Sequence, residues 1–217
     1  MSNPTNEDIQ STLKRYPGLK YTEDNGNPLI YGEVELLHKE LNSPIDEFSI
    51  EMRFPSQYPY YFPEVIETGG KIERIPQRHL FVRNNNELCL GVPPEIYLRC
   101  RNGITIEWFM ENVLMPRLAE EYNVNHGGAY LNEYPHNRTE ALWRFYSTVL
   151  KTNDRDLILL LLDGIISNRL PKGFQPCLCG GNQKFKKCHR NCANELIPLG
   201  REYLSEQLLI LKSNTTP

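Results

Sequence analysis

The sequence predicts an α+β fold, with antiparallel strands in the first half of the chain and helices in the second. The strand signal is clearest at residues 48–54, where Phe48, Ile50, Met52 and Phe54 alternate with polar residues at the two-residue period of a half-buried strand. The helix signal takes over after residue 105, where apolar residues recur three and four apart. Because the two kinds of segment are separated along the chain, we expect an antiparallel sheet packed against helices.

The length and composition predict a folded protein with one main domain and an appendage. The chain has 217 residues, whereas single domains cluster around ~100–150. Its residues are 40% hydrophobic and 24% charged, which excludes a disordered or collagen-like chain. The net charge of −3 argues against nonspecific nucleic-acid binding by the whole chain, so we do not expect nucleic acid as a partner.

The sequence shows no membrane segment or export signal. The longest apolar run, residues 157–162, has six residues, against the ~20 that span a bilayer. The first ten residues lack a basic stretch followed by an apolar one, so we expect no signal peptide and a cytoplasmic protein without membrane contact. Six cysteines in that compartment are expected to stay reduced, and clustered ones then indicate a metal site or catalysis.

The first half of the chain is predicted to begin with one helix and two strands. Residues 5–15 have apolar residues at helical spacing, with Thr5 as the N-cap. Residues 28–38 and 48–54 alternate as strands. The turn-forming residues at 40–46 indicate a hairpin loop between these two strands.

A proline-rich turn at residues 55–63 is predicted to interrupt the strands. Val65 and Ile66 then begin one more short strand, so residues 30–67 are expected to form three or four antiparallel strands in sequential order. Residues 71–104 show no sustained period and are predicted to be an irregular surface segment. Long segments of that kind usually have a function.

The second half of the chain is predicted to be helical. Residues 105–122 form the first of these helices, with Pro116 kinking or ending it. Residues 139–150 have one apolar face, and residues 154–166 are too apolar for a surface helix and are expected to pack on both sides. Residues 194–212 are predicted to be a closing amphipathic helix.

A short module at residues 171–192 contains four soft metal ligands within thirteen residues. They are Cys177, Cys179, Cys188 and His189. Zinc binds four Cys or His ligands tetrahedrally, and Gly180 and Gly181 supply the permissive backbone that a tight turn between ligands needs. A Cys3His site with no open position would hold a structural Zn²⁺ rather than a catalytic one. Cys192 lies outside this pattern.

This stretch resembles the SEC-C motif, a short zinc-binding module that recurs in bacterial proteins. The motif has the pattern Cys-x-Cys-x8-Cys followed by Cys or His, and the four ligands match it position by position. The resemblance covers only this module, and it implies that these four residues bind zinc.

The module is also strongly basic. Residues 171–194 contain no Asp or Glu and five cationic side chains, those of Lys172, Lys184, Lys186, Lys187 and Arg190. Such a patch can dock nucleic acid or an acidic protein surface. Alternatively, the cations offset the anionic thiolates and keep the module soluble. The sequence leaves both interpretations open.

Cys89 lies in the middle of the irregular segment, away from the other cysteines of the chain. A lone cysteine is more often a small buried hydrophobe than a nucleophile. Here, however, a proline-rich turn at residues 58–63 follows an alternating strand, and His79 precedes the cysteine by ten residues. This combination resembles the ubiquitin-conjugating (E2) family over residues 5–150.

The E2 resemblance implies a UBC-like fold, an antiparallel four-stranded meander with N-terminal and C-terminal helices. It also implies that Cys89 is the catalytic nucleophile and that His79 occupies the position of the family's His-Pro-Asn histidine. Cys89 would accept a protein C-terminus as a thioester from an E1-like activating partner and transfer it to an acceptor such as a lysine amine. The acyl donor would be a ubiquitin-like protein or the C-terminus of a signalling enzyme. Related bacterial proteins place such enzymes in anti-phage defence.

The chain departs from the family at one point. Leu80 and Phe81 stand where the His-Pro-Asn motif has Pro and Asn. The family's asparagine braces the active-site loop and assists the oxyanion, and Phe81 can do neither. His79 is therefore the candidate replacement in catalysis, while bracing of the loop by the same residue stays open. Three asparagines nearby are further candidates for an amide, namely Asn84, Asn85 and Asn86.

Two other functions remain as alternatives. A UBC fold without a competent nucleophile serves as a non-catalytic protein-interaction module, here with a structural zinc knuckle. The chain could instead be a zinc-dependent nucleic-acid binder, which salt-dependent binding would reveal. The expected domains are a conjugating domain at residues 1–150, a connecting helix at 151–170, a zinc knuckle at 171–192, and an amphipathic helix and tail at 193–217.

Overall fold

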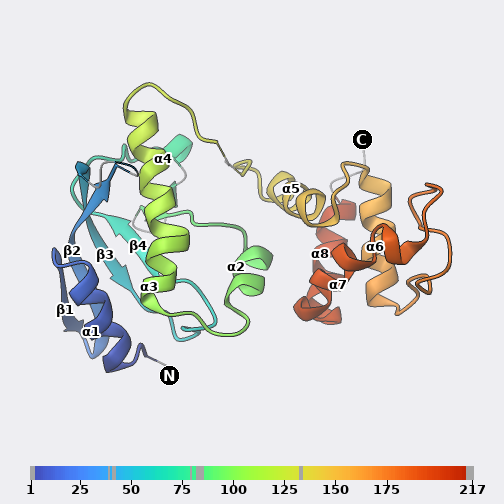
Figure 1. Cartoon of the computed structure of the whole chain (residues 1–217), viewed down its shortest axis with the longest axis horizontal. Coiled ribbons are helices and arrows are strands. Elements are labelled where there is room, and N and C mark those ends of the chain that lie inside the picture. Colours follow the sequence, from blue (N-terminus) through green and yellow to red (C-terminus); the bar gives the residue numbers. More distant parts are fainter. Residues whose placement is uncertain are drawn as a thin grey trace. The chain divides into compact units, whose positions relative to one another are not determined.

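The structure, a computed structural model, describes residues 3–38, 40, 43–78, 80–81, 86–131 and 134–213. The chain, drawn in Figure 1, divides into two compact units. The first unit comprises Met1–Gly91 and Arg99–Glu133, and the second comprises Val92–Leu98 and Tyr134–Pro217. Residues 138–150 therefore belong to the second unit, whereas the sequence-based division kept them with residues 1–150.

The first unit is built on an antiparallel sheet (Figure 1). Among the described residues its strand order is β1-β2-β3-β4-β6-β5, so the first four strands form a meander. The strands are β1 (Leu19–Asp24), β2 (Asn27–Leu37), β3 (Pro44–Arg53), β4 (Glu64–Glu67), β5 (Leu80–Phe81) and β6 (Glu87–Leu88). The α+β class and the sequential antiparallel strands of residues 30–67 are thus confirmed.

The first strand, β1, was missed by the sequence pattern. Only Leu19 of this edge strand is buried, so the strand has no apolar alternation to detect. Its turn to β2 is formed by Asn25 and Gly26, whose φ angles of 53° and 78° are both left-handed. Asn-Gly is favoured in such turns because these two residues tolerate positive φ. This dipeptide is the signal that would have located β1.

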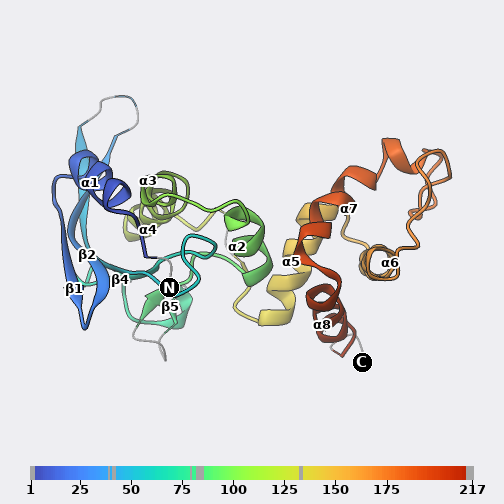
Figure 2. The same ribbon diagram turned by 90° about the horizontal axis from the view of Figure 1, so that it is seen from below.

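One face of the sheet is buried as the alternation predicts. Phe48, Ile50 and Met52 of β3 are fully buried, whereas Glu51 and Arg53 are partly exposed. Phe54, the fourth residue expected on the buried face, follows the strand and is only half-buried. Figure 2 shows helices on one side of the strands. These helices are α1 (Asn6–Arg15), α3 (Ile106–Phe109) and α4 (Met115–Asn125). The alternating residues of β3 therefore form the core of the first unit.

The carboxylate of Asp8 joins three segments of this unit. Asp8 lies in the first turn of α1, which Thr5 caps as expected by accepting a hydrogen bond from the Asp8 N–H. The Asp8 carboxylate accepts hydrogen bonds from the Tyr58 hydroxyl at 2.8 Å and from the Ile106 N–H at 2.9 Å. Burial raises the pKa of Asp8 more than these hydrogen bonds lower it. One side chain thus connects α1, the proline-rich turn and the start of α3.

Pro116 does not end its helix. The helix continues from α3 through a π-helical turn, Met110–Leu114, into α4. Proline has no N–H, so the carbonyl of Asn112, four residues earlier, loses its α-helical donor. Arg99 Nη2 donates a hydrogen bond to that carbonyl oxygen at 2.8 Å. The same guanidinium lies over two aromatic rings, those of Phe62 and Trp108.

The segment of residues 71–104 is more regular than expected. It contains a short 3₁₀ turn, Pro76–Arg78, the strands β5 and β6, and a helix, α2 (Pro93–Cys100). Two prolines open α2, where the missing N–H groups would have no intrahelical acceptor in any case. The expectation of an irregular segment was wrong here, because paired prolines are compatible with the first turn of a helix as well as with a loop.

The second unit is helical. Its main helices are α5 (Arg138–Leu150), α6 (Arg155–Ile166), α7 (Arg190–Leu196) and α8 (Arg201–Ser213). Asn137 and Asp154 cap α5 and α6 by accepting hydrogen bonds from backbone N–H groups of the first turn. The helices expected at residues 139–150 and 154–166 are therefore confirmed.

The closing segment is not one helix. Residues 194–212 were expected to be continuous, but Pro198 and Gly200 separate α7 from α8. Gly200 has a φ of 82°, which ends the preceding helical turn. No helix in the described part of the chain is long and apolar enough to cross a membrane.

A buried carboxylate, that of Glu121 in α4, connects α4 to the segment before β5. The side chain of Glu121 is fully buried and pairs with Arg78 and Arg117. Arg78 Nε donates to Glu121 Oε2 at 2.9 Å, and the Tyr130 hydroxyl donates to Oε1 at 2.5 Å. Arg117 Nη2 also donates to the carbonyl oxygen of Arg78 at 2.7 Å. We call Arg78, Arg117, Glu121 and Tyr130 the Glu121 network.

Glu121→Gln should destabilise the first unit, because it leaves two buried guanidinium groups without a counter-charge. Breaking a buried ion pair costs roughly 3–5 kcal/mol, and we expect a loss of that size in the free energy of unfolding. Urea denaturation, with hydrogen exchange of the α4 amides to identify the unit, measures it. Glu120→Gln removes the same charge from the neighbouring, less buried residue and should cost less than about 0.5 kcal/mol. Equal losses for the two variants would contradict the role given to the Glu121 network.

Candidate functional site

The structure brings the four predicted metal ligands together. They are Cys177, Cys179, Cys188 and His189, and their ligand atoms lie within 4.8 Å of one another. The sulfur atoms of Cys179 and Cys188 are 3.6 Å apart. His189 Nδ1 lies 3.2 Å from the sulfur of Cys177 and 3.2 Å from the sulfur of Cys188. We call these four residues the Cys/His cluster.

The distances within the Cys/His cluster suit a single metal ion. Tetrahedral geometry with metal–sulfur bonds of about 2.3 Å and metal–nitrogen bonds of about 2.0–2.1 Å places two sulfurs about 3.8 Å apart, and sulfur and nitrogen about 3.6 Å apart. The three separations given above are a few tenths of an ångström shorter, and all the ligand atoms lie within 4.8 Å of one another. Thiolate and imidazole ligands are those that soft and borderline metal ions prefer. The cluster can therefore hold a metal ion.

A short hairpin of the backbone positions these ligands. The Cys177 N–H donates to the Gln183 carbonyl at 3.1 Å, which pairs the two arms of the hairpin. Gly180, with a φ of 72°, allows the chain to reverse between the ligand pairs. Phe185 is buried in the core of the second unit, and its carbonyl accepts a hydrogen bond from the Cys188 N–H at 3.0 Å. The returning arm is thus anchored beside its ligands.

The thiols of the Cys/His cluster differ in their affinity for protons. Burial would raise the pKa of Cys177, but hydrogen bonds from the Cys179 N–H and the His189 side chain outweigh it and lower the pKa to about 6. Burial, and then the nearness of the other two thiols, raises the pKa of Cys188 to about 12. Sulfurs this close repel one another when all are ionised, whereas a coordinated metal cation stabilises each of them as a thiolate.

The other candidate, Cys89, lies where the chain leaves the sheet. It directly follows β6, whose Leu88 is fully buried, and precedes α2. Its side chain is half-buried, with Sγ 4.0 Å from the carbonyl oxygen of Gly91. The pKa of Tyr61, in the proline-rich turn, is raised first by burial and then by nearby groups that include Glu87 and Cys89. β6 also pairs with β4, the strand that directly follows the proline-rich turn, so the turn and the cysteine, far apart in sequence, lie in one region of the first unit.

The second predicted catalytic residue, His79, lies outside the described residues, as do Asn84 and Asn85. Both neighbours of His79 in the sequence are described. Arg78 belongs to the Glu121 network, and Leu80 of β5 pairs with Leu88 of β6, the residue before Cys89.

The residues of the Glu121 network, which position the segment before β5, were not identified from the sequence. Arg117 and Glu121 are four residues apart in a predicted helix, a spacing that indicates an ion pair. Nothing in the local pattern pointed to Arg78, because its partners lie about forty residues further along the chain. The network fixes the backbone immediately before His79.

Cys100 and Cys192 are buried cysteines outside these sites. Cys100 is fully buried, and burial raises its pKa to about 11, more than the neighbouring Arg99 lowers it. Cys192 is buried in the core of the second unit and is not part of the Cys/His cluster. No disulfide joins any of the six cysteines, all of which lie in the described part of the chain.

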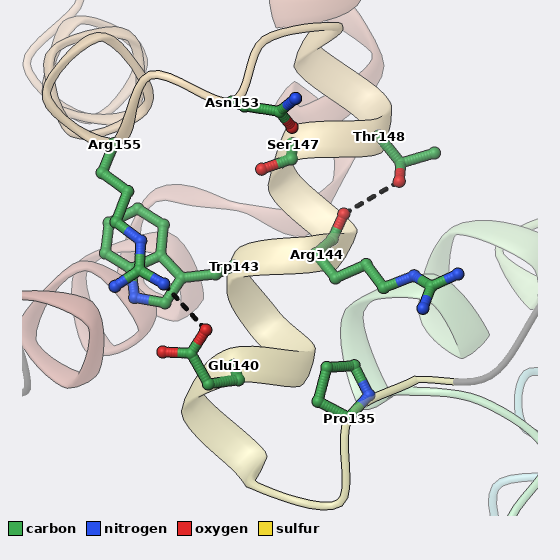
Figure 3. A pocket seen from close by; sticks show the side chains of 8 residues that line it. All are labelled: Pro135, Glu140, Trp143, Arg144, Ser147, Thr148, Asn153 and Arg155. Atoms are coloured by element: carbon green, nitrogen blue, oxygen red, sulfur yellow. Dashed lines mark hydrogen bonds and ion pairs between the residues drawn. The ribbon is translucent and has the colours of Figure 1, made fainter.

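A polar pocket of about 470 Å³ lies in the second unit, between α5 and the start of α6 (Figure 3). The guanidinium of Arg155 lies over the Trp143 ring, 4.9 Å from its centroid, and donates to Glu140 Oε2 at 2.7 Å. This ion pair neutralises Arg155, whereas Arg144, the other arginine of the lining, lies over the Tyr134 ring.

In the folded protein, Cys89 should be alkylated faster than Cys100. Cys89 is half-buried, whereas Cys100 is inaccessible and, with a pKa of about 11, has on the order of one thiolate in a thousand at pH 8. Peptide mass spectrometry after timed exposure to iodoacetamide, with metal present to protect the Cys/His cluster, measures both rates. In urea the two rates should converge. Equally slow labelling of both cysteines in the folded protein would contradict the accessibility of Cys89.

Comparison with known proteins found no match to this chain among protein-family models, curated proteins or solved structures. The interpretation of its function therefore depends on the chemistry and geometry of its own residues.

Proposed function

We propose that this chain is an E2-like conjugating enzyme, which carries a protein C-terminus on Cys89 as a thioester and transfers it to an acceptor amine. The observation that carries this proposal is the position of Cys89. Its half-buried thiol directly follows the short strand β6, which pairs with β4, the strand that follows the proline-rich turn at residues 58–63. The resemblance to the E2 family supplies the reaction class and, by analogy, an anti-phage setting.

Two acyl transfers make up the proposed reaction. The Cys89 thiolate attacks the carbonyl carbon of the C-terminus held as a thioester on an E1-like partner; the new C–S bond forms as the partner's thiolate leaves. The acceptor amine then attacks the same carbon, so that a C–N bond forms, the bond to Cys89 breaks, and the amine gives up a proton to a base. The donor is a ubiquitin-like protein or the C-terminus of a signalling enzyme.

His79 is the proposed residue that replaces the missing asparagine of the family motif. An imidazole can accept the amine proton or donate a hydrogen bond to the developing oxyanion. The position of its neighbours supports this role: Arg78 is held by a buried carboxylate, and Leu80 is paired with Leu88 beside Cys89.

We assign a structural Zn²⁺ to the Cys/His cluster. Three sulfurs and one nitrogen complete a tetrahedron and leave no position for water or substrate, which is the character of a structural site. The surrounding hairpin is short and largely exposed, so metal binding would contribute directly to its folding.

The protein should contain about one zinc ion per chain, measured by elemental analysis of protein prepared without chelators. Cys177→Ser removes a ligand and should lower the stability of the second unit, with faster hydrogen exchange there. The first unit should be unaffected, because its core is built on separate elements. Cys192→Ala, which changes a buried cysteine that is not a ligand, should retain the metal. Protein without bound zinc would refute the assignment.

With its activating partner, ATP and acyl donor, the protein should gain a mass adduct that added thiols remove. Cys89→Ala should abolish the adduct, and Cys89→Ser should form a more stable oxyester, because an alkoxide leaves less readily than a thiolate. Cys192→Ala serves as the control and should form the adduct normally. Intact-protein mass spectrometry with and without thiol distinguishes these products.

His79→Ala should slow transfer to the acceptor more than it slows loading of Cys89, since only the second step needs a base for the amine proton. Single-turnover assays separate the two steps. Normal conjugation by Cys89→Ala would end the enzyme proposal. The alternative, a non-catalytic UBC-fold interaction module, would then account for the first unit.

A further inference from the structure

The hairpin module of the second unit carries positive charge that is not neutralised by ion pairs. Its five cationic side chains are exposed, and within the described part of the chain none of them forms an ion pair. They are Lys172, Lys184, Lys186, Lys187 and Arg190. Residues 171–194 contain no Asp or Glu to balance them.

The metal site alone does not explain this charge. Three thiolates around one divalent cation leave a single net negative charge, whereas the module has five positive side chains. Solubility alone does not require such an excess of one sign, because charges of both signs serve it. The excess cations are therefore available to an external anion.

An exposed aromatic residue lies among these cations. The Gln175 N–H donates to the Lys172 carbonyl at 2.8 Å, and the Lys172 N–H donates to Gln175 Oε1 at 2.5 Å, which closes a tight turn. Phe174 lies at the tip of this turn with 68% of its surface exposed. A large aromatic side chain that is exposed to this extent contributes little to packing within the protein.

Two of the cations flank the turn directly. The Lys186 N–H donates to the Gly173 carbonyl at 3.1 Å. A Cβ placed on Gly173 would lie 3.3 Å from Lys186 Cβ and 3.1 Å from Arg190 Nη1, so both side chains lie against this glycine. Lys172, Lys186, Arg190 and Phe174 thus form one surface, which we call the Phe174 surface.

We propose that the Phe174 surface binds single-stranded nucleic acid. The cations would contact successive phosphates while Phe174 stacks on a base, the combination that sequence-tolerant single-strand binders use. An acidic protein would satisfy the cations but would leave the exposed ring without a partner, so nucleic acid accounts for more of the surface. Because the whole chain has a net charge of −3, binding depends on these local contacts and weakens steeply with salt.

Fluorescence anisotropy of the zinc-loaded, full-length protein with a labelled oligodeoxythymidine of about 15 nucleotides tests the proposal. Phe174→Ala should weaken binding about tenfold through the loss of stacking. Lys186→Gln combined with Arg190→Gln should weaken binding and reduce the slope of log Kd against log salt by about 1.4, since each phosphate contact contributes about 0.7. The control is Arg138→Gln combined with Lys151→Gln, which removes the same charge elsewhere on the second unit and should leave the slope unchanged.

Three outcomes would overturn the proposal: no binding at low salt, equal effects of the two double variants, or a poly-glutamate peptide that binds as tightly and is insensitive to Phe174→Ala. The last would identify an acidic protein as the partner instead. Zinc content is measured for each variant, because Arg190 adjoins a metal ligand. Cys89→Ala should bind the oligonucleotide normally, so that failure of the conjugating activity and failure of this proposal can be told apart.

Discussion

The first unit depends on a carboxylate that has been taken out of water. Glu121 is stable in the interior because two guanidinium groups face it, one from its own helix and one from the segment before β5. Attraction between charges grows as the dielectric constant falls, but burial also removes the hydration of both groups. Loss of one partner is therefore far more costly here than in an exposed pair. The ion pair with Arg78 holds the segment before β5, which has few apolar residues of its own. Asp8 also connects separate segments, but through hydrogen bonds from neutral donors, the Tyr58 hydroxyl and the Ile106 N–H. The region around Cys89 is therefore shaped by a few polar contacts as well as by the apolar core.

The sequence predicted those elements whose information is local. The alternation of β3 and the cap at Thr5 both act within a few residues, and the structure confirms them. The four ligands of the Cys/His cluster also lie within one short hairpin, which explains why their spacing was sufficient to place them together. The failures have equally local causes. The strand β1 was missed because it has almost no buried face, and the only local signal for it is the turn at Asn25 and Gly26. The helix α2 was missed because its prolines can either open a helix or interrupt one.

What the sequence could not provide was contact between distant segments. The ion pair between Arg78 and Glu121 joins two elements that are 43 residues apart and share no sequence pattern. The same holds for the exposure of Phe174, which in the sequence is one more aromatic residue in a basic stretch. Composition showed that the module is cationic, but only the turn geometry shows an aromatic ring presented beside the charges.

The π-helical turn before α4 links two positions that are far apart in the chain. Pro116 removes a donor from the helix, and Arg99 replaces it at Asn112 while its plane lies over Phe62 and Trp108. A lysine at position 99 could supply the charge but not a planar group that stacks and donates in its own plane. Loss of the arginine would therefore remove the donor to the Asn112 carbonyl and the cation over both rings at the same time.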